Sequence, residues 1–477
     1  MVDVHRSSDD LPRSGGDLPR SGGDFLSRLK ASLVGEGRTP FVVVGNFEVE
    51  QYWAEGEYGL PRAGFSTSGA VVNRMDEFAL LLAGPDDHVV LKEAPDPDFL
   101  GYLSALGVPL PGLLCPERQD PERVVTADVL DDEPVLARLR ALAATGAQLL
   151  PHGVSVLEER LARAGDLPVA GGPATLCKRV NSKIYSRRLA DELGLPQPAG
   201  WTSETLAEWA AAAGRARQIL AAGGTVAVKD AFGVSGRGIL VLRDGSRLDQ
   251  LDRMLRRRAE RSGDDRLALV VEEWVGKRTD LNYQVTVGRT GTVHFDFVKE
   301  AITEGGVHQG HRFPARLSPA ERGQLRDAGE LIGRRLAGEG YRGVVGIDAM
   351  VGDDGRVLPV IEINARHNMS TYQARVQELL LAPGQRAMAR HYPVRLRTRV
   401  PFKTFHDRLD DLLLPGAGGT GVLVTTFATV NAAAGRPGAE TFDGRLYTLL
   451  VADSADRLGA LDAEVGRRLR TLAEVTG

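Results

Sequence analysis

Three oxygen-bearing side chains late in the chain have the types and spacing that a divalent cation prefers. Asp348 lies in an apolar run, and Glu362 and Asn364 follow it by fourteen and sixteen residues. Because Glu362 and Asn364 are two apart, a β-strand there would project both side chains from one face. The segment 352–355, Gly-Asp-Asp-Gly, is typical of a hairpin turn that would bring Asp348 alongside. Such oxygens suit Mg²⁺ bound with nucleotide phosphates; the alternative is unrelated polar residues at strand ends.

Arg366 extends this pattern by two more residues. If the strand continues beyond Asn364, the guanidinium of Arg366 projects from the same face. A fixed positive charge there would stabilise negative charge that is transferred or that develops during a reaction. We therefore predict a catalytic role for Arg366.

A lysine at the end of an apolar run precedes a glycine-rich segment. Lys229 ends the run 225–229, and another apolar run begins near Gly238. The predicted phosphate-binding loop contains Gly233, Ser235, Gly236 and Gly238. Glycines let backbone N–H groups approach phosphate oxygens, and the lysine supplies a point charge. This is not a Walker A loop, because no Gly-Lys-Ser/Thr follows and the next element is a strand. A β-hairpin with a glycine-rich turn is the alternative.

A second apolar run ends in two carboxylates, in the sequence Val270-Val271-Glu272-Glu273-Trp274-Val275. A buried carboxylate is costly without a partner. If the run enters a hinge between domains, Glu272 and the backbone of Trp274 and Val275 can meet a nucleobase. The alternative is a surface strand end with solvated acids.

The elements that must position these residues follow from apolar spacing and capping residues. Short apolar runs predict strands at 225–229, 238–242, 267–272, 283–287, 293–298, 345–351 and 357–363. Asn181–Leu193 has helical spacing and is followed by Gly194. Ser318, Pro319 and Glu321 predict the capped start of another helix.

Composition and layout indicate an α/β (α+β) protein of several domains. The heptapeptide DLPRSGG occurs twice in succession near the N-terminus, where apolar periodicity is lacking, so residues 1–36 are predicted to be a disordered tail. Alternating strands and helices predict a parallel, doubly wound domain at 37–175. A second domain is expected at 176–395, with a mobile lid at about 200–275. A small α/β domain at 396–477 completes the layout.

Bulk properties exclude several classes of protein. With 43% hydrophobic residues, a net charge of −4 and few aromatics, the chain lacks the basic surface of a nucleic-acid binder. No run approaches the roughly 18 apolar residues of a membrane span, and no signal-peptide pattern precedes the first domain. Cys115 and Cys177 are too few for a disulfide framework or a structural zinc site. We expect a cytoplasmic enzyme, with a homodimer as a common arrangement.

Residues 305–313 are expected to form a functional loop on the substrate side. Two histidines, a glutamine and an arginine lie there among glycines: His308, Gln309, His311 and Arg312. Arg312 could hold a carboxylate or a developing phosphate in a bidentate manner, which gives it a predicted catalytic role. Lys299, at the end of the preceding predicted strand, is a further candidate for substrate binding. The alternative is a solvated glycine-rich turn.

In this order, the motifs from Lys183 through Lys229 and Glu272 to Asp348 and Glu362-x-Asn364-x-Arg366 resemble the ATP-grasp superfamily. The resemblance covers residues 177–370 and is specific as an ordered set. It implies that Lys183 meets the α-phosphate of ATP and that the Lys229 loop is a lid over the other phosphates. It also implies that Glu272 to Val275 bind adenine, that Asp280 binds the ribose, and that Asp348, Glu362 and Asn364 hold magnesium.

The flanking regions resemble those of the peptide ligases related to the pheganomycin ligase. The segment from Val44-Gly45-Asn46 to Tyr52-Trp53 looks like their pre-ATP-grasp domain, and residues after 395 look like their small C-terminal domain. The resemblance implies ATP and one or two Mg²⁺ ions, for which Mn²⁺ can substitute. It implies as substrates a small carboxylic acid and an amine or peptide acceptor, in natural-product assembly.

The expected reaction is amide formation through an acyl phosphate. A carboxylate would attack the γ-phosphorus of ATP, with Lys229, Arg366 and Arg312 stabilising charge, and an amine would then displace phosphate. A closing lid would exclude water, which would otherwise hydrolyse the acyl phosphate. Three alternatives stay open: a kinase on the same nucleotide site, a non-catalytic ATP-binding protein, and an adenylating ligase that releases AMP.

Overall fold

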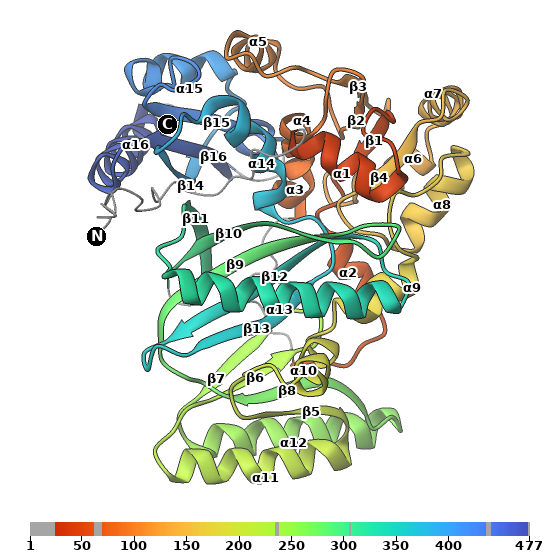
Figure 1. The fold of residues 1–477 in the computed structure, drawn as a ribbon, viewed down its shortest axis with the longest axis vertical. Coiled ribbons are helices and arrows are strands. Elements are labelled where there is room, and N and C mark those ends of the chain that lie inside the picture. Colours follow the sequence, from red (N-terminus) through yellow and green to blue (C-terminus); the bar gives the residue numbers. More distant parts are fainter. Residues whose placement is uncertain (1–23, 62–68, 234–237, 305–306, 436–439, 476–477) are drawn as a thin grey trace, which may run out of the picture.

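A computed structural model describes residues 24–61, 69–233, 238–304, 307–435 and 440–475, and it contains three β-sheets (Figure 1). A four-stranded parallel sheet lies at the upper right, an eight-stranded sheet at the centre, and a second four-stranded sheet at the bottom. None of the helices in the described ranges is long and apolar enough to span a bilayer.

The N-terminal sheet has the strand order β3-β2-β1-β4, and all neighbouring pairs are parallel. Its short, apolar strands are covered by helices, as parallel strands require. This confirms the predicted parallel α/β domain. Its strands are β1 (Phe41–Val44), β2 (His88–Val90), β3 (Gly112–Leu114) and β4 (Gln148–Pro151). Its helices are α2 (Val49–Trp53), α3 (Gly69–Asn73), η1 (Arg74–Phe78), α4 (Ala79–Leu82), α5 (Pro97–Ala105), α6 (Val125–Leu130), α7 (Glu133–Ala143) and α8 (Val156–Ala164).

A helix precedes this domain, inside the range that the sequence predicted to be a disordered tail. Helix α1 (Phe25–Val34) begins at Asp24, whose side chain accepts a hydrogen bond from Ser27 N at 2.7 Å, and ends at Gly35 with a positive φ of 94°. Phe25, Leu29 and Leu33 are buried in a core shared with the C-terminal region. The predicted limit at residue 36 is therefore wrong: the tail's low-complexity composition ends before this amphipathic segment.

The lower sheet forms a separate lid-like layer. It has the antiparallel order β5-β8-β6-β7, and α11 and α12 cover one of its faces (Figure 1). Helices α9 (Ala174–Val180) and α10 (Lys183–Glu192) connect it to the N-terminal domain. The elements of the lid are β5 (Gly200–Thr205), α11 (Leu206–Ala221), β6 (Val226–Asp230), β7 (Ile239–Leu242), α12 (Gly245–Ser262) and β8 (Arg266–Glu273).

The central sheet has the order β13-β12-β9-β10-β11-β14-β16-β15. Its strands are β9 (Lys277–Val287), β10 (Val293–Glu304), β11 (Val307–Phe313), β12 (Gly343–Gly352), β13 (Val357–Asn364), β14 (Arg386–Leu396), β15 (Gly421–Thr426) and β16 (Phe442–Ala452). Helix α13 (Pro319–Gly338) starts with the predicted capping box of Ser318 and Glu321 and packs on the apolar face that includes Tyr283 and Val285. Helix α14 (Met369–Leu380) lies against the other, polar face, where Thr371 Oγ1 donates to Gln284 Oε1 at 2.6 Å.

One prediction on the central sheet is corrected. The expected loop at 305–313 contains strand β11, which pairs with β10 on one side and with β14 on the other. The C-terminal region has the predicted helices and strands, and its strands β16 and β15 extend the central sheet through β14 and share a core with the N-terminal domain. The remaining C-terminal elements are α15 (Phe402–Leu409), η2 (Asp410–Leu412), η3 (Ala428–Val430) and α16 (Ala455–Val475).

Candidate nucleotide and metal site

A row of polar side chains crosses four neighbouring strands on the face opposite α13. The pairing register places Glu362 opposite Asp348, Asp348 opposite Asn282, and Asn282 opposite Lys299. Residues directly opposite each other on antiparallel strands share a face, so all four side chains lie on one surface. Asn364 lies on the same face, two residues from Glu362.

The three predicted metal ligands are thereby brought together. Asn364 Nδ2 donates to Asp348 Oδ2 at 3.2 Å, and Asn282 Nδ2 donates to Asp348 Oδ1 at 2.8 Å. Burial, followed by the negative charge of Glu362, raises the pKa of Asp348 to about 6. A cation between these carboxylates would reverse that shift, because it favours the charged form.

The donor set fits magnesium. Asn282 Oδ1 is buried without a hydrogen-bond partner in the described structure, and it belongs to the side chain that contacts Asp348. Carboxylate and amide oxygens are the ligands that Mg²⁺ prefers, and Mg²⁺ usually keeps several waters and phosphate oxygens as further ligands. Among the described residues no three Asp, Glu, His or Cys side chains form a metal cluster. Sequence reasoning missed Asn282, although its alternation with Asp280 and Gln284 was a usable signal.

Lys183 joins the metal residues to the glycine-rich segment. At the start of α10, its backbone N donates to Ala231 O at 2.9 Å, which fixes the helix against the end of β6. Its ammonium donates to Glu362 Oε1 and to Gly233 O, both at 2.7 Å. Lys183 therefore lies between a predicted metal ligand and the predicted phosphate loop.

Lys229 and Glu272 form an ion pair across the lid sheet. They project from neighbouring strands β6 and β8, and Lys229 Nζ donates to Glu272 Oε1. Arg187, on α10, lies 3.7 Å from the second carboxylate oxygen of Glu272. All three side chains are largely buried. The cluster places two cations and one anion at the boundary between the lid and α10.

The other predicted nucleotide residues lie next to the lid strands, in the connection after β8 and on β9. Gly238 has a positive φ of 75° and its carbonyl accepts a hydrogen bond from Asp230 N at 2.7 Å. Trp274 and Val275 lie in the short connection between β8 and β9, where Trp274 N donates to Thr225 O at 2.8 Å. Asp280 accepts hydrogen bonds from Lys277 and from Thr303 Oγ1. Ser235 and Gly236 lie outside the described residues.

Arg366 connects the metal residues to the N-terminal domain. Strand β13 ends at Asn364, and the Arg366 side chain turns back so that its NH2 donates to Asn364 Oδ1 at 3.1 Å. Its Nε donates at 2.5 Å to Glu50 Oε1 on α2. Sequence reasoning had not assigned Glu50 a role. A contact between residues 316 positions apart leaves no local signal.

Lys299 and His311 face the start of α14. Lys299 is 1% exposed, and its ammonium donates to Ser370 O at 3.5 Å and lies 4.6 Å from the centre of the Phe297 ring. Among the described residues no carboxylate forms an ion pair with it, and burial lowers the pKa of Lys299 to about 7. His311 Nε2 lies 2.8 Å from Gln373 Oε1 and 3.3 Å from Ser370 Oγ.

Arg312 is not brought to this surface, which corrects its predicted catalytic role. It lies opposite Glu300, its ion-pair partner at 3.3 Å, and Glu300 follows Lys299 directly in β10. Because successive strand residues point to opposite faces, Arg312 and Lys299 project from different sides of the sheet. Gln309 is partly buried, and no role for it follows from its place on β11. The side chain of His308 lies outside the described part of the structure.

Comparisons with known proteins agree with this architecture. The family model described as Pre ATP-grasp domain matches residues 75–167. The chain is 29% identical over 312 residues to the [butirosin acyl-carrier protein]–L-glutamate ligase of Niallia circulans, covering 64% of this chain and 67% of that protein. It is 33% identical over 113 residues to the L-propargylglycine–L-glutamate ligase of Streptantibioticus cattleyicolor, covering 24% of this chain and 23% of that protein.

Solved structures show the same fold at low sequence identity. An ADP complex of N5-carboxyaminoimidazole ribonucleotide synthetase matches with a TM-score of 0.52 and 12% identity, covering 91% of this chain and 98% of that one. The biotin carboxylase of Campylobacter jejuni, in a βγ-ATP complex, matches with a TM-score of 0.52 and 14% identity, covering 86% and 94%.

The parallel N-terminal domain, the lid and the central antiparallel sheet thus define an ATP-grasp fold preceded by a pre-ATP-grasp domain. With the two glutamate ligases among its relatives, the protein is an ATP-grasp carboxylate–amine ligase.

Proposed function

We propose that this ligase activates a carboxylic acid as an acyl phosphate and transfers the acyl group to an amine, releasing ADP and phosphate. The observation that carries the proposal is the row of Glu362, Asp348, Asn282 and Lys299 on one face of the central sheet. At one end the row has oxygen donors for a cation, and at the other it has a buried ammonium without a carboxylate partner among the described residues. Phosphate transfer to a carboxylate needs both kinds of group close together.

Magnesium would be held by Asp348, Glu362, Asn364 and Asn282, where it would neutralise charge on the phosphates of ATP. Lys183 and Lys229 would bind phosphate oxygens, and Glu272, Trp274 and Val275 would meet adenine. This assignment is supported by the hydrogen bonds from Lys183 to Glu362 and from Lys229 to Glu272, which fix both ammonium groups.

In the first step, a carboxylate oxygen of the acid attacks the γ-phosphorus of ATP, the bond to the β-phosphate oxygen breaks, and ADP leaves. Arg366 is suited to stabilise the transferred phosphoryl group, since Glu50 and Asn364 fix its guanidinium. In the second step, the amine attacks the acyl carbon, loses a proton, and phosphate leaves. No nucleophilic side chain of the protein is required.

The acid substrate that Lys299 favours carries an amino-acid backbone or a second carboxylate. A buried ammonium is stabilised by an anionic ligand, because the attraction offsets part of the cost of burying the lone charge. The names of both ligase relatives contain L-glutamate. We therefore propose glutamate or a related acid, oriented by Lys299 and His311 toward the metal residues.

The acceptor is proposed to be an amino acid, a peptide or a carrier-bound amine. The resemblance to pheganomycin-type peptide ligases supports a peptide, and one relative acts on an acyl-carrier protein. Because the reaction consumes ATP, we place the enzyme in the cytoplasm.

The test incubates the full chain with ATP, Mg²⁺, L-glutamate and a panel of amines, peptides and carrier proteins. We expect ADP and phosphate to appear only when acid and acceptor are both present, with a product lighter than the summed substrates by one water. Formation of AMP would identify an adenylating ligase, and a stable phosphorylated product would identify a kinase. Nucleotide binding without turnover across wide acid and amine panels would contradict catalysis.

A further inference from the structure

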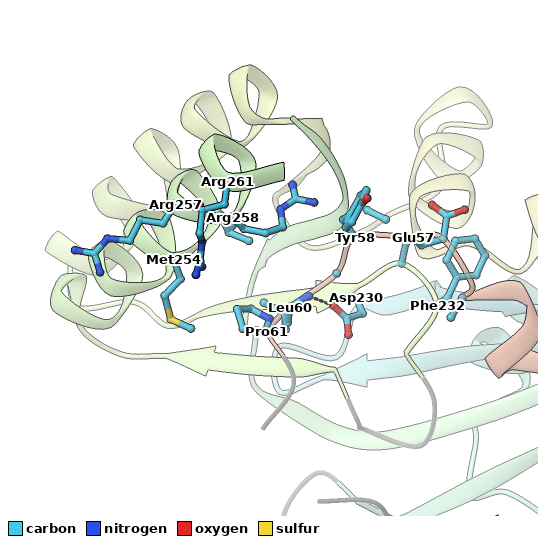
Figure 2. Close-up of a pocket in the computed structure, with 15 residues that line it drawn as sticks. Glu57, Tyr58, Leu60, Pro61, Asp230, Phe232, Met254, Arg257, Arg258 and Arg261 are labelled. Carbon is cyan, nitrogen blue, oxygen red and sulfur yellow. Dashed lines mark hydrogen bonds between the residues drawn. The ribbon is translucent and has the colours of Figure 1, made fainter. Parts of the chain in front are cut away.

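A cavity of about 570 Å³ lies outside the nucleotide cleft, between α12 of the lid and residues 54–61 of the N-terminal domain. In Figure 2 the side chains of Arg257, Arg258 and Arg261 lie at one end and Glu57 at the other. Tyr58 lies between Arg258 and Glu57, and Leu60, Pro61 and Asp230 lie below the arginines in this view. The cavity therefore has a basic end and a middle that is apolar apart from the carboxylate of Asp230.

The cavity lies at the end of the lid sheet, where it is lined by Asp230 and by Ala231 and Ala268, which pack with Ile184 on the face away from α11 and α12. Val226 and Val228 on β6 pack with α11 and α12, and Asp230, two residues further, points the same way and lines the cavity. Lys229 points to the opposite face, toward Glu272. None of the described residues that are predicted to bind ATP lines the cavity.

The three arginines at the basic end lack acidic partners in the described part of the chain, unlike Arg256 on the same helix, which pairs with Asp252 at 3.0 Å. Arg258 is held with its guanidinium 4.2 Å from the centre of the Tyr58 ring. Its Nη2 donates to Arg266 O at 2.6 Å, but its Nε and Nη1 are buried without hydrogen-bond partners in the described structure. Buried donors without partners are costly, and an anionic ligand would satisfy them if the guanidinium turned toward the cavity.

The two acidic groups that line the cavity are already engaged. Glu57 forms an ion pair with Lys178 at 2.7 Å, and Asp230 accepts a hydrogen bond from Leu60 N. Met254, which is 43% exposed, continues the apolar lining beside the arginines. Among the described charged residues that line the cavity, the three arginines alone make no ion pair and no hydrogen bond to a side-chain acceptor.

We propose that this cavity binds an amphipathic organic anion, with a phosphate or carboxylate headgroup on Arg257, Arg258 and Arg261 and an apolar body over Tyr58, Leu60 and Met254. Its walls come from two parts of the molecule that are joined by the hydrogen bond from Ala268 N to Tyr58 O at 2.9 Å. A bound ligand would hold the lid against residues 54–61. The proposal does not depend on the ligase reaction.

The test measures binding by calorimetry to the full chain saturated with Mg²⁺ and a non-hydrolysable ATP analogue, which blocks the nucleotide cleft. The probes are n-octyl phosphate (phosphate headgroup with an apolar body), N-octanoyl-L-glutamate (carboxylate headgroup with an apolar body) and 1-octanol (apolar body without an anionic headgroup). We expect at least one of the two anionic probes to bind about tenfold or more tightly than 1-octanol. Which of the two binds better identifies the headgroup.

The double substitution Arg257→Ala/Arg261→Ala should weaken binding of that probe about tenfold or more, because it removes two charge-assisted contacts. Arg253→Ala is the matched control on the same helix and should leave binding unchanged, since Arg253 does not line the cavity. Equal affinity for all three probes, no binding of any, or equal losses in the double variant and the control would overturn the proposal.

Discussion

Three buried lysines near the proposed site differ in whether their ammonium groups are paired with a carboxylate. Lys183 and Lys229, on the nucleotide side, each donate to a carboxylate, that of Glu362 or Glu272. Lys299, on the proposed acid side, is more deeply buried, and within the described ranges its ammonium contacts a backbone carbonyl and an aromatic ring but no carboxylate. The paired lysines are held ready for a highly charged ligand, whereas the unpaired lysine is a cost to the folded protein that a substrate anion can relieve.

The presence or absence of a carboxylate partner distinguishes lysines that stabilise the folded protein from a lysine that we expect to act in ligand binding. A buried ion pair is neutral to its surroundings, and removing one partner leaves an uncompensated charge. A buried lone ammonium already has that penalty, so replacing it with an apolar side chain should stabilise the protein and harm function. The predictions below test this contrast.

The largest effect is expected at the metal residues. Asp348→Asn and Glu362→Gln should each lower the rate of ADP formation by about a thousandfold, because each removes a charged oxygen from the proposed Mg²⁺ site. Rates are measured at saturating ATP and Mg²⁺. Glu330→Gln, on exposed α13, is the control and should keep full activity. A rate within threefold of the wild type in either site variant would refute the metal assignment.

The next effect is expected at Lys299. Lys299→Met should raise the KM for the acid by about ten- to a hundredfold, since it removes a charge-assisted contact of about 1.5–3 kcal/mol. The KM for ATP should change little, and Lys403→Met on exposed α15 should change neither constant. If the KM for ATP rises as much as the KM for the acid, Lys299 takes part in nucleotide binding, and the proposed difference between Lys299 and the paired lysines is wrong.

A smaller effect is expected at Glu272. Glu272→Gln leaves Lys229 and Arg187 without their shared carboxylate, so it should raise the KM for ATP by about tenfold and lower the melting temperature. Glu273→Gln, the next residue, makes no ion pair in the described structure and serves as the control. Unchanged stability of Glu272→Gln would show that this pair is not structural.

The smallest effect is on the pH dependence of stability. Because the pKa of Lys299 is lowered from its usual value near 10.5 to about 7, the folded protein binds fewer protons than the unfolded chain between these pH values. Stability attributable to this group therefore rises as pH increases from 7 toward 10.5. Lys299→Met should melt about 2 to 5 °C above the wild type at pH 7, with the gap narrowing by pH 10. A lower melting temperature at pH 7 would indicate a structural lysine.

Local signals in the sequence were sufficient for most elements. The capping box of Ser318 and Glu321 starts α13 as predicted, and the hairpin at 352–355 joins β12 and β13. These features depend on neighbouring residues alone. The prediction of a loop at 305–313 was wrong. Its glycine and polar residues lack the apolar pattern of a strand, but the backbone of β11 pairs with strands on both sides.

The sequence by itself determined the chemical types at the site and their order: Lys183, Lys229, Glu272, Asp348 and the alternating run from Glu362 to Arg366. Tertiary structure alone decided that Asn282 and Lys299 lie in register with Asp348, that Glu50 fixes Arg366, and that Arg312 faces away. The reason is that strand register and domain packing depend on pairings between distant residues, and such pairings leave no periodic trace in one sequence.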